Sequence, residues 1–203
     1  MNGLRFAVAG LLIGALAACE SSGSDTTGSG TVSPDSTAFA AKLSELDAAV
    51  DVWRSAETID AARVAAETAA NLVVGSNGPA YGDRNGDGSV SGETSAGILP
   101  GLDGTPPGAA SPLADTSCIT RDVLGGSWDD PAARWDQMNA AITDWRPDAN
   151  TMPTLTSHPM RVVGWSTFTL DIDPTDPEAL DLAHEYAGHA ALHVAISSDA
   201  LDC

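Results

Sequence analysis

Basic residues are scarce in this sequence. It contains 9 Lys and Arg residues against 28 Asp and Glu residues, which gives a formal net charge of −19 at pH 7. Because contacts to nucleic-acid phosphates are made mainly by Lys and Arg, this deficit excludes nucleic acid as a partner. Electrostatic docking of the folded domain on anionic lipid is disfavoured for the same reason.

Motifs of the common enzyme classes are also missing. The chain has no G-x-S-x-G nucleophile turn, no P-loop and no dinucleotide-binding glycine pattern. The sequence therefore favours a binding or interaction protein over an enzyme.

Long hydrophobic runs are absent except near the first residue. Arg5 precedes an apolar run over 6–18, which is too short to span a bilayer and is typical of a secretory signal. The run ends in Leu-Ala-Ala-Cys, with the cysteine at Cys19. This ending resembles the lipobox of bacterial lipoproteins. The resemblance implies that 1–18 is a cleaved signal peptide and that Cys19 is lipidated, which would anchor the protein to a membrane of the bacterial cell envelope, outside the cytoplasm. The alternative is an ordinary signal with a chance cysteine.

The segment that follows is rich in Ser, Thr and Gly and has little apolar surface to bury. We interpret residues 19–36 as a flexible tether and 37–203 as a single helical domain. The domain is long enough to form a hydrophobic core of its own.

Cysteine is rare as well, with three residues in the whole chain. If Cys19 carries lipid, Cys118 and Cys203 remain. In an oxidising compartment such an even pair predicts one disulfide, which would tie the last residue to the middle of the chain.

Apolar residues recur at helical spacing in four segments. These segments are 37–53, 58–74, 130–145 and 175–196, and the last begins with the capping-box pattern Thr-Asp-Pro-Glu. The predicted fold is all-α, a bundle of four to five helices.

Two other segments have no such clear pattern. The Val- and Thr-rich stretch 157–173 is open between a short strand near 161–172 and a short helix. Residues 76–124 form a loop-rich insertion made largely of Gly, Pro, Ser and Asp, and a loop this long needs something to organise it.

A candidate for that role is the sequence DRNGDGSVSGET, which begins at Asp83. Alternating oxygen-bearing side chains around a glycine turn are the ligands that Ca²⁺ requires. The stretch resembles an EF-hand or dockerin-type calcium loop, and the resemblance implies these ligands: Asp83, Asn85, Asp87, Ser89, Ser91 and Glu93.

The loop departs from the family pattern at its last ligand. Position 12 should be a bidentate acid, but it is Thr94, and Glu93 stands one residue early. The paired flanking helices of an EF-hand are also missing. We therefore expect a weak structural site, and the alternative is a turn rich in Asp, Asn and Gly with no ion. The wider run AAETAANLVVGSNGPAYGDRNGDG resembles segments of uncharacterised bacterial envelope proteins, which implies no activity.

Histidines are concentrated near the end of the chain. Glu185, His189 and His193 share a helix face and could bind zinc or another transition metal, with His158 joining them. The spacing after His184 is not that of the H-E-x-x-H proteases, so their mechanism is not indicated. The alternative is that these residues only cap or pack the bundle.

Taken together, the sequence predicts a lipid-anchored envelope protein with a structural calcium loop, acting as a non-enzymatic binding module. Its partner would be a protein, a polymer or a small molecule, and two tryptophans, Trp128 and Trp165, could line a ligand groove. The alternative is a transition-metal-binding or metal-dependent protein that uses the helix from His184 to His193.

Overall fold

The computed structural model describes residues 33–92, 94–145 and 154–203, and in these ranges it contains helices, turns and loops but no strand. The prediction of an all-α helical bundle is confirmed. The elements are α1 (Pro34–Arg54), α2 (Ile59–Val74), η1 (Ser111–Leu113), η2 (Ile119–Val123), α3 (Pro131–Asp144), α4 (His158–Asp171) and α5 (Ala179–Asp199).

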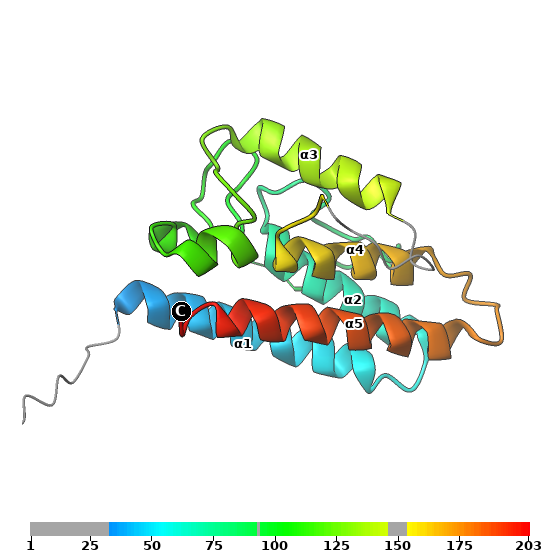
Figure 1. Cartoon of the computed structure of the whole chain (residues 1–203). Coiled ribbons are helices and arrows are strands. Elements are labelled where there is room, and N and C mark those ends of the chain that lie inside the picture. Colours follow the sequence, from blue (N-terminus) through cyan, green and yellow to red (C-terminus); the bar gives the residue numbers. More distant parts are fainter. Residues whose placement is uncertain (1–32, 93, 146–153) are drawn as a thin grey trace, which may run out of the picture. The chain divides into compact units, whose positions relative to one another are not determined.

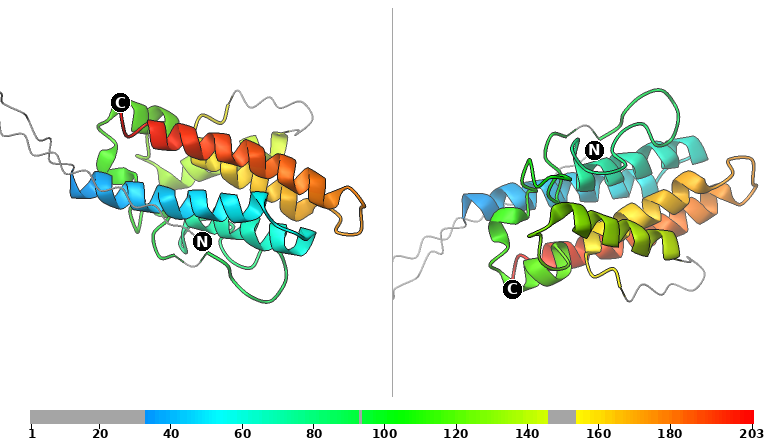
Figure 2. Two further views of the ribbon diagram at one scale, coloured as in Figure 1. Left: turned by 90° about the horizontal axis from the view of Figure 1, so that it is seen from below. Right: turned by 90° about the horizontal axis from the view of Figure 1, so that it is seen from above.

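Four of these helices form the core of the bundle. Helix α1 packs against α2 and α5, and α4 packs against the same two helices, so the four close into a ring (Figure 1). Helix α3 lies outside this ring, over α4, as the view from above in Figure 2 shows. Large side chains from most elements meet in one core, among them Phe39, Trp53, Ile98, Trp135 and Trp165. One compact unit contains all of the described residues.

Helix α1 begins earlier than the sequence indicated. Ser33 is its N-cap, and the Ser33 hydroxyl oxygen accepts a hydrogen bond from the backbone N–H of Ser36. Pro34 occupies the first helical turn, where its missing N–H leaves no bond unmade. The predicted tether, 19–36, therefore extends too far, because its residues 34–36 belong to α1. Its residues 19–32 lie outside the described residues.

The end of α2 shows why a glycine follows it. Gly75 has φ of +67°, and a Cβ placed there would lie 2.4 Å from the backbone nitrogen of Gly97. This close approach lets the returning chain bond to the last turn of the helix: the N–H of Ile98 donates to the carbonyl of Leu72, at 3.1 Å. The long loop is thus attached to α2 rather than hanging free of it.

The ambiguous segment forms helix α4, so the alternative of a strand near 161–172 is wrong. Ser157 caps the helix, and Pro159 lies in its first turn. Most of its length is buried, so it has no polar face opposite an apolar one. The sequence therefore lacks the helical spacing of apolar residues by which a helix is recognised. At Gly164 a Cβ would lie 2.4 Å from the ring of Trp145, so only glycine permits this packing.

Helix α5 begins later than predicted and without the expected capping box. Its N-cap is Glu178, whose side chain makes no capping bond. The preceding acids form turns instead: Asp173 accepts from the N–H of Thr175, and Asp176 from that of Glu178, both at 2.9 Å. The capping-box residues therefore build the turn that leads into the helix. In the part of the chain that the structure describes, no helix is both long and apolar enough to cross a membrane.

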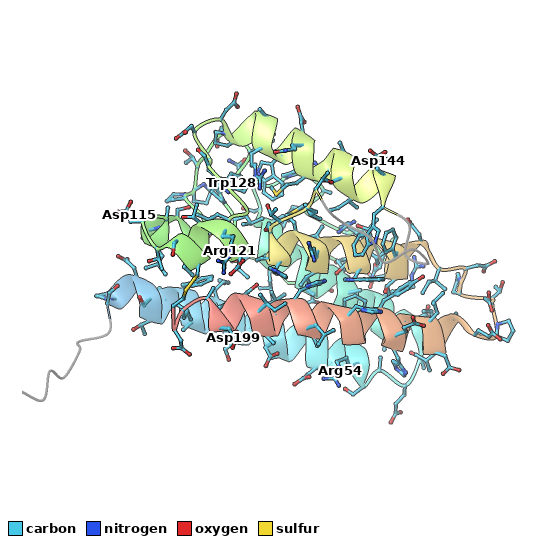
Figure 3. The ribbon with its side chains drawn as sticks, in the orientation of Figure 1. Arg54, Asp115, Arg121, Trp128, Asp144 and Asp199 are labelled. Atoms are coloured by element: carbon cyan, nitrogen blue, oxygen red, sulfur yellow. A yellow bond between two sulfur atoms is a disulfide. The ribbon has the colours of Figure 1, made fainter. Side chains whose placement is uncertain are left out.

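The two remaining cysteines are joined. Cys118 lies just before η2 and Cys203 follows α5, with their Cα atoms 6.1 Å apart. The disulfide lies near the labelled Arg121 in Figure 3, at the end of the bundle where α1 begins. The predicted pairing is confirmed.

Candidate functional site

The predicted calcium loop rests on a carboxylate from α2. Glu67 is fully buried, with 0% of its surface exposed. Its Oε2 atom accepts hydrogen bonds from the backbone N–H groups of Arg84 (2.7 Å) and Asn85 (2.9 Å). Its Oε1 atom accepts from the N–H of Ser91, at 2.7 Å. A single buried side chain therefore holds both arms of the loop.

One turn further along α2, Asn71 completes this clamp. Its side-chain amide donates to the carbonyls of Gly82 (3.0 Å) and Ser91 (2.7 Å), and its Oδ1 accepts from the N–H of Gly82 (3.1 Å). Asn71 is also fully buried. Because Glu67 and Asn71 are four residues apart, they share one face of the helix and meet the loop together. We refer to these two residues as the α2 clamp.

Three of the predicted ligands shape the interior of the loop. Asp83 accepts from the N–H groups of Gly86 (2.7 Å) and Gly88 (2.8 Å), and Asn85 accepts from that of Asp87 (2.9 Å). The carboxylates at 83 and 87 are exposed. Since an ionised carboxylate offers about four acceptor sites, these bonds leave oxygen lone pairs free for a cation.

The remaining predicted ligands, at positions 89, 91 and 93, do not shape the loop in this way. Ser89 is exposed, and its N–H donates to Asp87 at 2.8 Å. Ser91 has both its backbone N–H and its carbonyl engaged by the α2 clamp. Glu93, the displaced acid, lies outside the described residues, as does the predicted lipidation site Cys19.

Two arginines connect the loop to the rest of the bundle. Arg63 donates to the carbonyls of Asn85 (3.3 Å) and Ile172 (3.1 Å). Arg84 points inward and donates to the hydroxyl of Thr167 on α4, at 2.8 Å. Burial lowers the pKa of Arg84, and the nearby charges of Asp171 and Glu67 partly offset this by raising it. The guanidinium thus neutralises part of the buried negative charge at the clamp.

The histidines of α5 do not gather where the sequence suggested. The ring of His189 stacks on Trp165, with centroids 4.4 Å apart and planes 10° from parallel. The Nε2 atom of His184 lies 2.9 Å from the carbonyl of Ala56. Within the described ranges no three His, Cys, Asp or Glu side chains form a metal-holding group, so Glu185, His189 and His193 are not brought into one.

His193 instead meets a histidine from another helix. Its Nδ1 atom lies 2.9 Å from the Nδ1 atom of His158, at the start of α4. Burial and the neighbouring charge of His158 lower the pKa of His193 to about 3. Burial and the charge of Arg161 also lower the pKa of His158. Both imidazoles are therefore neutral near pH 7.

A groove of about 500 Å³ opens beside the loops that precede α3. Trp128 lines it, near the start of α3 in Figure 3, and packs edge-on against Trp135 with centroids 5.4 Å apart. The indole N–H of Trp128 donates to the carbonyl of Leu124. Trp165 is only 1% exposed and belongs to the core, so only Trp128 lines a groove. The other groove residues include Pro100, Pro107, Ser111, Thr120, Ser127 and Asp129.

The α2 clamp was not anticipated from the sequence, although a signal for it existed. Glu67 and Asn71 are polar residues four apart in a part of the helix that, apart from Thr68, is otherwise Ala, Val and Leu. A helix buried on nearly all faces must give such residues hydrogen-bond partners. No family model, curated protein or solved structure matches this chain, so its function is inferred from its residues and their geometry.

Proposed function

We propose that this protein is a lipid-anchored component of the bacterial cell envelope, in which a Ca²⁺ ion bound by the 83–94 loop stabilises a helical, non-enzymatic binding domain. The observation that carries the proposal is the shape of the loop. Asp83 and Asp87 expose carboxylates on one tight turn, and the α2 clamp fixes that turn in place. Asn85, Ser89 and Ser91 would add amide, carbonyl or water-mediated oxygens, and Glu93 would add a carboxylate.

The ion would act as a structural cross-link. The loop has no paired EF-hand whose helices could rearrange when the ion binds. Binding therefore gives stability rather than a conformational signal. Loss of a bidentate ligand at position 12 weakens binding toward a dissociation constant of about 10⁻⁴–10⁻³ M, which is the range of extracellular modules. A location outside the cytoplasm supplies calcium in that range.

The groove beside Trp128 is the surface that we assign to the partner. An aromatic ring, prolines and hydroxyl groups line it, and its charged lining residue is Asp129. No basic side chain is among its described lining residues, which favours a neutral or cationic ligand over an anionic one.

The calcium site is tested by removing its charge with the smallest change of shape. Asp83→Asn with Asp87→Asn keeps one side-chain oxygen at each position, although the bonds to Gly86 and Gly88 use different oxygens of Asp83, so one of the two is lost. We expect a lower melting temperature in chelator and, as the diagnostic result, loss of the additional stabilisation that calcium gives to the wild-type protein. That stabilisation amounts to about 1.4–2.7 kcal/mol at calcium concentrations of about 10 to 100 times Kd.

The matched control is Asp47→Ala with Asp136→Ala, which removes the same charge from exposed positions on α1 and α3. This control should keep the full response to calcium. If the wild-type protein melts at the same temperature with about 10 mM calcium, which is about 10 to 100 times the expected Kd, as with chelator, the proposed calcium site is wrong.

The lipid anchor is tested by Cys19→Ala. Without the thiol no acyl chain can be attached, so we expect the protein to move from the membrane fraction to the soluble fraction. Ser21→Ala is the control, because it alters the same segment and keeps the cysteine. Unchanged membrane association of Cys19→Ala would contradict the proposal.

A further inference from the structure

The His158–His193 pair joins two helices through atoms that normally bind either a proton or a metal. His158 is the first residue of α4 and His193 lies in α5, and their Nδ1 atoms are 2.9 Å apart. The rings are tilted by 46°, with centroids 5.1 Å apart, so they are not stacked on each other. Both side chains are partly exposed, so an ion can reach them.

The separation of the two nitrogens indicates a particular coordination geometry. Imidazole nitrogens bind divalent metals at about 2.0–2.1 Å. Two such ligands whose nitrogens are 2.9 Å apart subtend an angle of about 90° at the ion. A right angle is that of neighbouring ligands in a square-planar or tetragonal complex, which is the geometry of Cu²⁺ and Ni²⁺.

We propose that His158 and His193 form a two-imidazole site for a divalent transition-metal ion, with Cu²⁺ preferred and water completing the coordination. This site differs from the predicted set because it uses neither Glu185 nor His189, and His158, which the sequence suggested only as an additional ligand, supplies its second imidazole from α4. It is also independent of the proposed calcium loop, whose oxygen ligands suit a different kind of ion.

The protonation of the pair permits binding. The 2.9 Å contact between the two Nδ1 atoms requires an N–H on one ring and a lone pair on the other, so at least one imidazole is neutral and offers a ligand nitrogen. In the free protein one Nδ1 carries a hydrogen, which it donates to the other. For both Nδ1 atoms to bind the ion, that ring moves its proton to Nε2, so the pair binds the metal without releasing a proton.

The charges around the pair limit its affinity. Arg161 lies close enough to lower the pKa of both histidines, and Asp122 acts in the opposite direction on His158. Asp122 is itself paired with Arg121, at 2.7 Å, and the charge of Arg121 also lowers the pKa of His158. A site with two imidazoles and no protein carboxylate therefore favours metals that bind nitrogen strongly. Among the divalent first-row transition metals, Cu²⁺ binds such ligands most tightly.

The test is electron paramagnetic resonance of the purified full-length protein with equimolar Cu²⁺. We expect hyperfine splitting from two nitrogen ligands in the wild-type protein and its loss in both His158→Ala and His193→Ala. His189→Ala, which removes a neighbouring imidazole from the same helix, should keep the signal. His158→Gln and His193→Gln replace the two variants if the alanine forms fail to melt cooperatively.

Two results would overturn the proposal. A two-nitrogen signal that survives the loss of His158, or that disappears in His189→Ala, would place the copper elsewhere on the protein. Absence of a two-nitrogen signal in the wild-type protein would show that the pair is only a hydrogen bond between neutral imidazoles.

Discussion

Glu67→Ala is expected to lower the free energy of unfolding by about 3–5 kcal/mol, near the upper end for a single substitution. The carboxylate is fully buried and accepts three backbone hydrogen bonds, from Arg84, Asn85 and Ser91. Removing it leaves three N–H groups without a partner, and each buried donor left unsatisfied costs about 1–3 kcal/mol unless water reaches it.

Glu67→Gln separates the hydrogen bonds from the charge. An amide oxygen placed where Oε2 lies keeps the bonds to Arg84 and Asn85, but the amide nitrogen then faces the N–H of Ser91. We expect an intermediate loss of about 1–3 kcal/mol, because one bond of the three is replaced by two opposed donors. The neighbouring Arg84 would also lose a compensating charge.

These losses are measured by urea unfolding in the presence of chelator, so that calcium does not contribute. Glu57→Ala is the matched control, because it removes an exposed carboxylate close to the start of α2. Hydrogen exchange gives a local readout: the amides of Arg84, Asn85 and Ser91 should exchange much faster in Glu67→Ala. A loss of stability no larger than that of Glu57→Ala would show that the clamp does not hold the loop.

The clamp also defines what a calcium ion would add. Both carboxylate oxygens of Glu67 already accept backbone N–H groups on the inner side of the loop. Glu67 is therefore an anchor for the turn rather than the ligand missing at position 12. Because the clamp holds the loop from inside, an ion on the outer carboxylates adds a second, weaker constraint to a turn that is already formed.

The bundle was predictable because most of its helices have an apolar stripe and a polar face. In α1 the stripe includes Phe39, Leu46 and Trp53, all of which are buried. Helix α4 lacks a polar face over most of its length, so its Val and Thr content could not be told from a strand. Only its start, with Ser157 and Pro159, carried the signal of a helix.

The candidate sites were predictable only where their residues are close in sequence. The spacing of the acids in the 83–87 turn can be seen in the sequence, whereas Glu67 reaches this turn from α2, which ends at Val74, nine residues before Asp83. His158 and His193 are likewise neighbours only after α4 has packed against α5. Spacing along the helix pointed to His189 as the partner of His193, but the ring of His189 stacks on that of Trp165 instead.

Loss of the disulfide is expected to have an effect as large as loss of Glu67. Cys118 and Cys203 are 85 residues apart, and a cross-link closing a loop of that length stabilises a fold by about 4–5 kcal/mol in the chain-entropy model. The double variant Cys118→Ala with Cys203→Ala should lose up to this amount. Its unfolded chain is less restricted and exposes more surface, so its urea m-value should rise above that of the wild-type protein.

Reduction supplies the matching experiment on the unaltered chain. The wild-type protein in strong reductant should approach the stability of the double variant, while the double variant itself should not respond to reductant.

The bond ties the end of α5 to η2, and η2 leads into the loops that form the groove beside Trp128. Release of the bond should therefore raise hydrogen exchange in η2 before it affects α2. If reduced and oxidised proteins unfold at the same urea concentration, the bond contributes nothing to the fold, and the domain does not depend on an oxidising compartment.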